Sequence, residues 1–329
     1  MTEAAAPRWG ILSTANIARA AFLPALREAG GRATVVASRE RSKAQAFASA
    51  AGVERAVQGY EAVLGDPAVD AVYVPLPNNL HASWTIKALE AGKAVLCEKP
   101  LCLDPDETEA VLAAARRTGG LLWEAFVFPF GPQYQRLCRL IGEGVIGELR
   151  EIQSSFHFLL SRPDNIRLSA ELGGGALNDV GCYPVRLARD LFAAEPAQAW
   201  ALGNWGREVE TEMWGSLGFP SQRRLLFSCG FARTYDTYTR LLGSEGQIHV
   251  QNPFHPKVGD PLEVHPAGGT GFRESPTTDE HSFTAALRHI AAVLAGDEEP
   301  RHLASETSLG NARSLHMLAS EARGARERG

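Results

Sequence analysis

The sequence is organised around the stretch Val95-Leu96-Cys97-Glu98-Lys99-Pro100, in which a short apolar run ends on an acid, a lysine and a proline. Residues 81–93 before it carry apolar side chains at helical spacing, and Gly92 suits the helix cap. Residues 94–97 are then long enough for one buried parallel strand. In open α/β sheets, ligands bind outside the carboxyl ends of the strands, so Glu98 and Lys99 are predicted to face a ligand. The alternative is an ordinary surface lysine.

The composition is typical of a soluble globular protein with two domains. The chain has 329 residues, too many for one ordinary core, and its apolar and charged contents are 45% and 22%. A net charge of −5 gives no reason to expect nucleic acid or an anionic membrane as a partner. No apolar run reaches the length of a membrane span, and residues 1–8 lack the apolar core of a signal peptide.

The cysteines and histidines give no sign of a disulfide framework or a metal site. The five cysteines are odd in number and scattered, and none forms a C-x-x-C pair, which predicts reduced thiols in a cytoplasmic protein. Four histidines of the second half lack metal-ligand spacing, namely His157, His249, His255 and His265. No metal is therefore assigned.

The amino-terminal residues predict a strand, a turn and a helix. The strand covers residues 9–12, and 13–18 form the turn into a helix that reaches about Ala29. This is the position of a G-x-G-x-x-G dinucleotide fingerprint, whose glycines are replaced here by small residues. Small residues let the backbone approach a pyrophosphate, although they also commonly pack a helix on a sheet. The predicted cofactor residues of this turn are Ser13, Thr14, Ala15, Asn16 and Ile17.

The end of the second predicted strand, residues 33–37, indicates which dinucleotide binds. Enzymes that use NAD usually place an acid there to hold the ribose hydroxyls, whereas this chain has Ser38 and Arg39, with Lys43 close behind. A guanidinium can pair with a 2′-phosphate and lie flat on adenine, so these residues predict NADP(H) rather than NAD(H). The alternative is a solvated basic loop, in which Glu40 would offset part of the charge.

Strands and helices alternate through the first part of the chain, and strands dominate the second. A strand at 69–74 and the non-helical stretch 75–81 continue the series. This βαβ rhythm predicts a Rossmann-type parallel sheet over residues 1–125. Strands without intervening helices then predict an α+β domain with a large open, mostly antiparallel sheet over 126–329. The chain closes with two predicted helices, 281–295 and 305–321, which are available to pack back on the first domain.

A second candidate site begins at the glycine run Gly173-Gly174-Gly175. The run cannot hold regular structure, and the chain from Ala176 onward is predicted to be helical. Asp179 and Tyr183 are four residues apart and therefore share one helix face, from which they can address one pocket. The alternative is a solvated aspartate beside a half-buried tyrosine.

Several short motifs together resemble the glucose–fructose oxidoreductase, inositol dehydrogenase and rhizopine-catabolism family (Gfo/Idh/MocA), in its order and spacing. They are Gly10-Ile11-Leu12 with Asn16-Ile17-Ala18, Pro75 with Asn79-Leu80-His81, residues 92–100, Glu124-Ala125-Phe126, and 173–177 with 179–183. The chain is most similar to the NADP-dependent branch that acts on pyranoses, which includes aldose dehydrogenases and deoxysugar ketoreductases. One departure is at Pro129 and Gly131, where many relatives carry Arg and His, so contacts of those side chains are not expected here.

The resemblance implies that Lys99, Asp179 and Tyr183 form the catalytic set. A carbonyl that accepts hydride becomes an alkoxide, which Lys99 would hydrogen-bond. Tyr183 would donate or relay the proton, and Asp179 would hold a substrate hydroxyl or orient its neighbours. The resemblance also implies a cis peptide bond between Lys99 and Pro100. Further cofactor contacts are expected from the loops at the strand ends, namely Leu76, Pro77, Asn79, His81, Glu98 and Lys99.

The family also suggests the partners. Sugar hydroxyls need polar partners, which Asn165 and Arg167 would supply beside Lys99, Asp179 and Tyr183, the alternative being a polar surface loop. In the family the open face of the second sheet makes oligomer contacts, so a homodimer or homotetramer is expected. Three tryptophans are candidates for that face or for the core, namely Trp200, Trp205 and Trp214.

The expected function is hydride transfer between NADP(H) and the carbonyl or alcohol of a sugar, either free or nucleotide-linked. Two alternatives remain, a trans-dihydrodiol dehydrogenase-like enzyme and a non-catalytic dinucleotide or sugar sensor of the same fold. The presence of Lys99 together with Tyr183 favours the enzyme.

Overall fold

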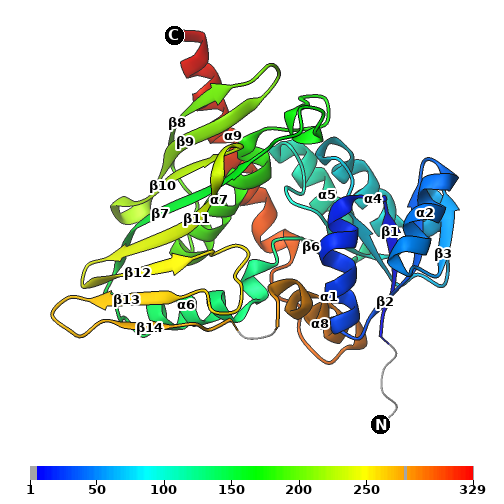
Figure 1. Cartoon of the computed structure of the whole chain (residues 1–329), viewed down its shortest axis with the longest axis horizontal. Coiled ribbons are helices and arrows are strands. Elements are labelled where there is room, and N and C mark those ends of the chain that lie inside the picture. Colours follow the sequence, from blue (N-terminus) through cyan, green and yellow to red (C-terminus); the bar gives the residue numbers. More distant parts are fainter. Residues whose placement is uncertain (1–5, 278–279, 329) are drawn as a thin grey trace. The chain divides into compact units, whose positions relative to one another are not determined.

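The computed structural model describes residues 6–277 and 280–328, which fall into two compact units (Figure 1). The first unit holds the chain up to Cys102, then residues 106–127 and 283–309. The second holds 103–105, 128–282 and the chain from Gly310 onward. The chain therefore returns to the first unit after most of the second has been built.

The first unit is built on six parallel strands in the order β3-β2-β1-β4-β5-β6. The strands are β1 (Arg8–Leu12), β2 (Arg32–Ser38), β3 (Arg55–Gln58), β4 (Ala71–Val74), β5 (Ala94–Cys97) and β6 (Leu122–Glu124). The strand order reverses between β1 and β4, which is the switch point where open α/β sheets bind ligands. The prediction of a Rossmann-type sheet is confirmed, although β3 was expected to be a plain connection.

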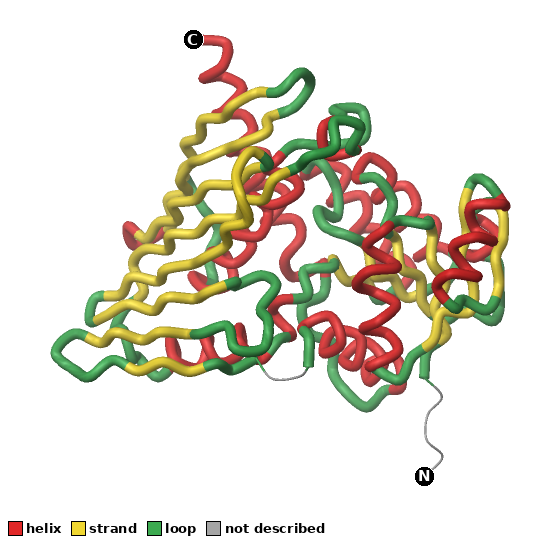
Figure 2. The backbone as a smooth tube through the Cα atoms, in the orientation of Figure 1, coloured by secondary structure: helices red, strands yellow, loops and turns green. Residues whose placement is uncertain are grey.

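Helices alternate with these strands (Figure 2). They are α1 (Leu23–Glu28), α2 (Arg41–Ala51), α3 (Glu61–Leu64), α4 (His81–Glu90) and α5 (Pro105–Thr118), and α8 (Ser282–Ala295) follows later in the chain. A short 3₁₀ turn, Asn78–Leu80, leads into α4, within a stretch that was expected to be non-helical.

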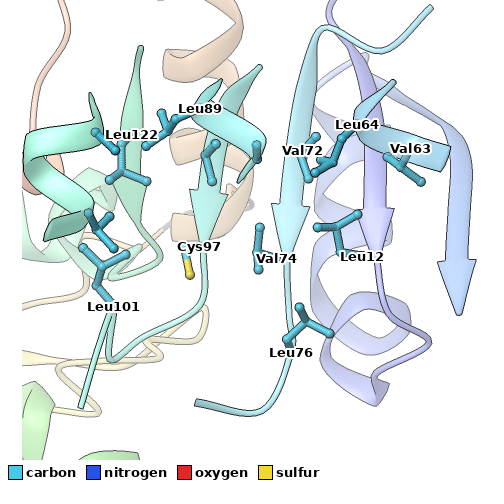
Figure 3. Close-up of a cluster of buried hydrophobic side chains, with 14 of the residues drawn as sticks. Leu12, Val63, Leu64, Val72, Val74, Leu76, Leu89, Cys97, Leu101 and Leu122 are labelled. Atoms are coloured by element: carbon cyan, nitrogen blue, oxygen red, sulfur yellow. The ribbon is translucent and has the colours of Figure 1, made fainter. Parts of the chain in front are cut away.

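The central strands of this sheet are buried on both faces. Every residue of β4 and β5 is buried, and Figure 3 shows Val72, Val74 and Cys97 packing with Leu12 and Leu101. Full burial of an aliphatic side chain of this size stabilises the fold by about 1.5–3 kcal/mol. The loops that carry the predicted cofactor residues therefore begin directly where β4 and β5 leave this rigid core.

The second unit is built on an eight-stranded sheet in the order β14-β13-β12-β11-β7-β10-β9-β8. The strands are β7 (Leu149–Leu159), β8 (Gln198–Trp205), β9 (Glu210–Phe219), β10 (Arg223–Gly230), β11 (Ala232–Gly243), β12 (Gly246–Gln251), β13 (Leu262–Pro266) and β14 (Phe272–Glu274). Only the β7–β10 pair is parallel among the described strands of this sheet. The prediction of an open, mostly antiparallel sheet is confirmed.

One face of this sheet is apolar and covered, and the other is open. Ile152, Leu225 and Leu241 are fully buried on the covered face, where α7 (Cys182–Phe192) packs on β7 and β10. On the open face, Trp200 and Trp214 are 50% and 37% exposed. Strand alternation places these two on the same side, because the register pairs Trp200 with Ser216 and Trp214 with Leu202.

Three details differ from the sequence-based expectations. Trp205 does not share the open face with the other two tryptophans, because strand alternation turns it to the face opposite to that of Trp200, and its ring lies 4.5 Å from the Arg326 guanidinium. A helix not expected from the sequence, α6 (Pro132–Gly142), follows Gly131. The last helix, α9 (Ala304–Arg328), runs well past the predicted end at residue 321. Among the described residues, no helix is long and apolar enough to cross a membrane.

Candidate active site

The turn after β1 keeps a glycine-like backbone although it lacks the fingerprint glycines. Ser13 has a φ of 144°, a region that glycine adopts far more readily than other residues. The following helix contains a π turn, Ala18–Phe22, just before Pro24, whose missing N–H interrupts α-helical hydrogen bonding. The sequence therefore builds a dinucleotide-type turn with a serine in a strained position.

A surface groove of about 350 Å³ opens beside this turn. Three of the predicted cofactor residues line it, Thr14 and Asn16 from the turn and Lys43 from α2; the others are Arg19, Ala46, Phe47 and Ala50. Ile17 at the same turn leaves 42% of its apolar side chain exposed. The groove therefore brings residues of this turn together with residues of α2.

The end of β2 presents an exposed arginine. The Ser38 hydroxyl accepts a hydrogen bond from the Glu40 N–H at 3.3 Å, and the Glu40 carboxylate pairs with the Lys43 ammonium at 2.6 Å. Within the part of the chain that the structure describes, the Arg39 guanidinium makes no hydrogen bond or ion pair. Burial raises the pKa of the neighbouring Tyr60, and the positive charge of Arg39 acts against that rise. Glu40 therefore offsets Lys43 rather than Arg39.

Side chains fix the backbone around Lys99. The Tyr73 hydroxyl donates to Glu98 Oε1 at 2.5 Å, directly before the lysine. After it, the Leu101 N–H donates to Glu124 Oε1 at 2.8 Å, and the other oxygen of the buried Glu124 accepts from Ser308 at 2.6 Å. The Lys99–Pro100 peptide is cis, as predicted.

His81 ties two of the loops together. Its side chain is fully buried, and its ring nitrogens each lie 2.8 Å from a backbone carbonyl oxygen, Nδ1 from that of Pro100 and Nε2 from that of Leu76. Burial lowers the pKa of His81, while the two carbonyls act in the opposite direction. Both ring nitrogens face backbone carbonyl oxygens, so His81 links the loops after β4 and β5.

The second unit holds the other predicted catalytic residues. Asp179 lies in a π turn, Leu177–Gly181, that leads into α7. Its carboxylate accepts a hydrogen bond from the Arg167 Nε at 2.6 Å, and the Arg167 guanidinium lies 5.8 Å from the Phe158 ring centre. Asn165 accepts from the Arg167 N–H through its side-chain oxygen. The polar loop before the glycine run is therefore ordered around Asp179.

Tyr183 sits in an aromatic cage. Only 7% of the residue is exposed, and its ring centre lies 5.2 Å from that of Phe254 and 5.3 Å from that of Phe156. The imidazole of His255 meets it at 5.4 Å. Offset and tilted contacts of this kind stabilise aromatic pairs and fix the ring plane. The ring of Tyr183 is thus held in place. It is also more buried than the half-buried tyrosine of the alternative interpretation.

The glycine run depends on a residue that the sequence did not single out. Gly175 has a φ of 110°, and a Cβ there would overlap the Glu210 carboxylate. A Cβ on Gly174 would overlap the carbonyl of Arg167. Glu210 accepts from the Leu177 N–H at 3.1 Å, and burial raises the pKa of its carboxyl group. Glu210 lies 33 positions away from Leu177, so only the strand register reveals this contact.

Two family models match this chain. One, described as the oxidoreductase family with an NAD-binding Rossmann fold, covers residues 8–126, and the Gfo/Idh/MocA C-terminal domain covers 134–249. The chain belongs to the Gfo/Idh/MocA oxidoreductase family. Its predicted catalytic residues fall in both parts, Lys99 in the Rossmann unit and Asp179 with Tyr183 in the second unit.

Similar Gfo/Idh/MocA proteins include enzymes with several substrates. The crystal structure of KijD10, a 3-ketoreductase from Actinomadura kijaniata in complex with NADP and TDP-benzene, is 33% identical, with a TM-score of 0.88 and coverage of 97% of this chain and 98% of that one. A D-xylose 1-dehydrogenase (NADP(+)) from Haloferax volcanii is 37% identical over 89% of this chain and 90% of the relative. A trans-1,2-dihydrobenzene-1,2-diol dehydrogenase from Xenopus laevis is 30% identical over 74% and 75%.

Proposed function

We propose that this Gfo/Idh/MocA oxidoreductase uses NADP(H) and transfers hydride between the nicotinamide and the carbonyl or alcohol of a sugar. The observation that carries the proposal is the carboxyl edge of the first-unit sheet. There the strand ends of β1, β2, β4 and β5 present the predicted cofactor residues, and Lys99 stands among them on a turn fixed by side chains. The bound cofactor supplies the hydride, and the protein supplies position and electrostatics.

The exposed Arg39 supports the choice of NADP(H). Its guanidinium is not engaged by another described side chain, so it is available to a 2′-phosphate without breaking an existing ion pair. Ser38, with its hydroxyl at the end of β2, replaces the acid that would repel that phosphate. The turn Ser13–Ile17 and the loop Leu76–His81 are proposed to hold the pyrophosphate and the nicotinamide ribose.

The chemistry is proposed to rest on three residues. Lys99 hydrogen-bonds the substrate oxygen, where negative charge develops as the carbonyl is reduced. Tyr183 delivers a proton to that oxygen, and the aromatic cage fixes the direction of its hydroxyl. Asp179, held by Arg167, accepts a hydrogen bond from a substrate hydroxyl. Asn165 and Arg167 then order the loop over the sugar and offer further polar contacts.

A division of labour between the units is part of the proposal. The first unit binds the cofactor, and the second binds the sugar and forms a homodimer or homotetramer through its open sheet face. The exposed Trp200, Trp214 and Tyr238 on that face support the assembly, because aromatic side chains are enriched at interfaces. Light scattering of the wild type against Trp214→Glu tests it, and equal masses above that of a monomer would exclude this face.

The cell compartment is proposed to be the cytoplasm. No disulfide joins the five cysteines, all of which lie within the described residues, and Cys97, Cys102, Cys182 and Cys229 are buried. Burial raises the pKa of Cys97 and Cys229 well above the ordinary value, so these thiols stay protonated and unreactive.

A substrate panel tests the proposed function. Free aldoses with NADP⁺, nucleotide-linked ketosugars with NADPH and a trans-dihydrodiol with NADP⁺ would be compared by nicotinamide absorbance. The proposal expects turnover with at least one sugar class and a higher kcat/KM with NADP(H) than with NAD(H). Turnover of the dihydrodiol alone would replace the sugar assignment, and binding without turnover of any compound would favour a sensor.

A further inference from the structure

Three side chains with metal-binding atoms lie together on the second sheet, away from the predicted catalytic residues. His249 is on β12, and Glu263 and His265 are on β13. Antiparallel pairing places His249 opposite Glu263, and His265 sits one pleat further along the same face, opposite Gln247. One ligand atom from each of the three lies within 4.8 Å of the other two. Spacing along the chain hides this cluster, and the strand register creates it.

We propose that His249, Glu263 and His265 bind a divalent transition-metal ion, with Zn²⁺ as the best fit. Two imidazoles and one carboxylate form a donor set that zinc uses when a water completes the coordination. With bonds of about 2.0–2.2 Å, the ligands of a tetrahedral zinc ion are about 3.4 Å apart. The cluster therefore has to contract by about 1 Å, and the exposed His265 side chain can make that movement.

The present contacts of the His249 ring nitrogen Nε2 are long. The Arg240 Nε lies 3.3 Å from His249 Nε2, and the ring centres of His249 and His265 are 5.1 Å apart. A metal would take a lone pair of His249 in place of this long contact with Arg240.

Two arginines, Arg273 and Arg240, contact the proposed ligands and would compete with a metal. Removing such an arginine should strengthen metal binding, which gives a second test of the proposal. The Arg273 guanidinium of β14 lies 3.6 Å from the Glu263 carboxylate, in an ion pair whose side chains are 64% and 38% exposed. Exposed pairs of this kind are weak and easily replaced. Removing Arg273 therefore frees a ligand without touching the cluster, whereas Arg240 also bonds Gln153 and Gln247 and would be a less clean variant.

A bound ion would join β12 to β13 at the end of the sheet opposite to β8 and β9. The cluster lies on the same open face as the exposed tryptophans but at the opposite end of the strand order, and it lies outside the residues proposed for the cofactor and the substrate. The site is structural in character, because it links neighbouring strands and lies outside the residues proposed for catalysis.

Zinc titration of the tag-free, full-length, metal-stripped protein against a chromogenic chelator tests the proposal. The wild type is expected to bind one Zn²⁺ at this cluster, and His265→Ala to weaken that binding at least about tenfold. Glu263→Gln should weaken it as well, and Arg273→Ala should tighten it severalfold. His316→Ala, which removes an exposed histidine of α9, is the matched control and should change nothing.

Two results would overturn the proposal. Equal zinc affinity in the wild type and His265→Ala would place the metal elsewhere, for example on a cysteine, and the absence of a stoichiometric site in the wild type would remove it altogether. Because His265 is exposed, its alanine variant is expected to fold, and an unchanged NADPH affinity confirms that.

Discussion

The two units prepare their proposed catalytic residues in opposite ways. In the first, side chains from distant positions, Tyr73, His81 and Glu124, fix the backbone on both sides of Lys99. In the second, the backbone itself turns sharply through Gly173–Gly175, and the side chains of Glu210 and Asn178 bond to the turn. The side chains around the end of β5 hold the backbone from which the long side chain of Lys99 extends. The glycine turn instead sets where α7 begins, and this places Tyr183 among the aromatic rings that surround it.

This contrast assigns different consequences to substitutions. Around Lys99, several side-chain hydrogen bonds hold the backbone, so the loss of any one should have a small effect. The ammonium group of the lysine itself should matter most for the reaction. Around Asp179 and Tyr183, the turn depends on three glycines and on hydrogen bonds from Asn178 and to Glu210, so changes there should lower stability as well as activity.

Replacing Lys99 by alanine should have the largest effect. Loss of a group that acts on the developing alkoxide is expected to lower kcat by about a thousandfold, while NADPH affinity changes only severalfold. Steady-state kinetics and cofactor fluorescence measure the two quantities. Lys87→Ala on the exposed side of α4 is the control and should leave both unchanged. If Lys99→Ala kept near-normal kcat, the first unit would not supply the reacting group.

Replacing Arg39 by alanine sharpens the account of the same edge. A charge-assisted pair with a 2′-phosphate contributes about 1.5–3 kcal/mol, so NADPH affinity should fall by about tenfold to a hundredfold. NADH affinity should stay the same, because NADH lacks that phosphate. Calorimetry with both cofactors measures this, and Arg41→Ala nearby is the control. An equal loss for NADPH and NADH would remove the 2′-phosphate assignment.

Replacing Glu210 by alanine tests its support of the glycine turn in the second unit. The buried Leu177 N–H loses its acceptor, which should lower the free energy of unfolding by about 1–3 kcal/mol and reduce kcat as the turn loosens. Glu210→Gln keeps an oxygen acceptor and should retain most of the stability. Chemical denaturation of the three proteins checks the order, and a stable alanine variant would show that the turn does not depend on Glu210.

Glu210 also predicts that the stability of the protein depends on pH. Burial raises the pKa of the Glu210 carboxyl group, so the folded state holds its proton to higher pH than the unfolded chain does. The stability that Glu210 contributes is therefore present below the unfolded pKa of about 4.3 and is lost as pH rises through the folded pKa. Glu210→Gln should lack this loss. If the free energies of unfolding of the wild type and Glu210→Gln changed with pH in the same way across this range, the raised pKa would be contradicted.

The smallest expected effect is a gain. Ser13 pays a conformational cost at a φ of 144°, so Ser13→Gly should raise the free energy of unfolding by about 1 kcal/mol and leave the turn unchanged. Thermal and chemical unfolding measure it, with Ser49→Gly inside α2 as a control that should destabilise. A loss of stability in Ser13→Gly would mean that the serine side chain has its own role in the turn.

The sequence predicted those strands and loops that are marked by a short run of neighbouring residues. Val95–Cys97 are apolar, buried and followed by an acid and a lysine, so β5 and its strand-end loop were predictable from one short run. Strand β3 was missed because Arg55–Gln58 carry no apolar run and lie partly exposed. The proposed catalytic residues came from motif spacing, which the family shares.

Contacts across strands were the part that could not be predicted. Glu210 reaches Leu177 only because of where β9 lies, and His249 meets Glu263 and His265 only across two paired strands. Pairing register is set by the folded sheet, and a chain read in one dimension does not contain it explicitly.

The central claim is that this chain moves hydride between a nicotinamide and a sugar carbon. The most direct measurement is mass spectrometry of the product formed from NADPH that carries two deuterium atoms at C4 and a ketosugar of the panel. The product of the wild type is expected to carry one deuterium on the former carbonyl carbon, and Lys99→Ala is expected not to form it. NADPH consumption without deuterium in the sugar, or equal labelling by Lys99→Ala, would contradict it.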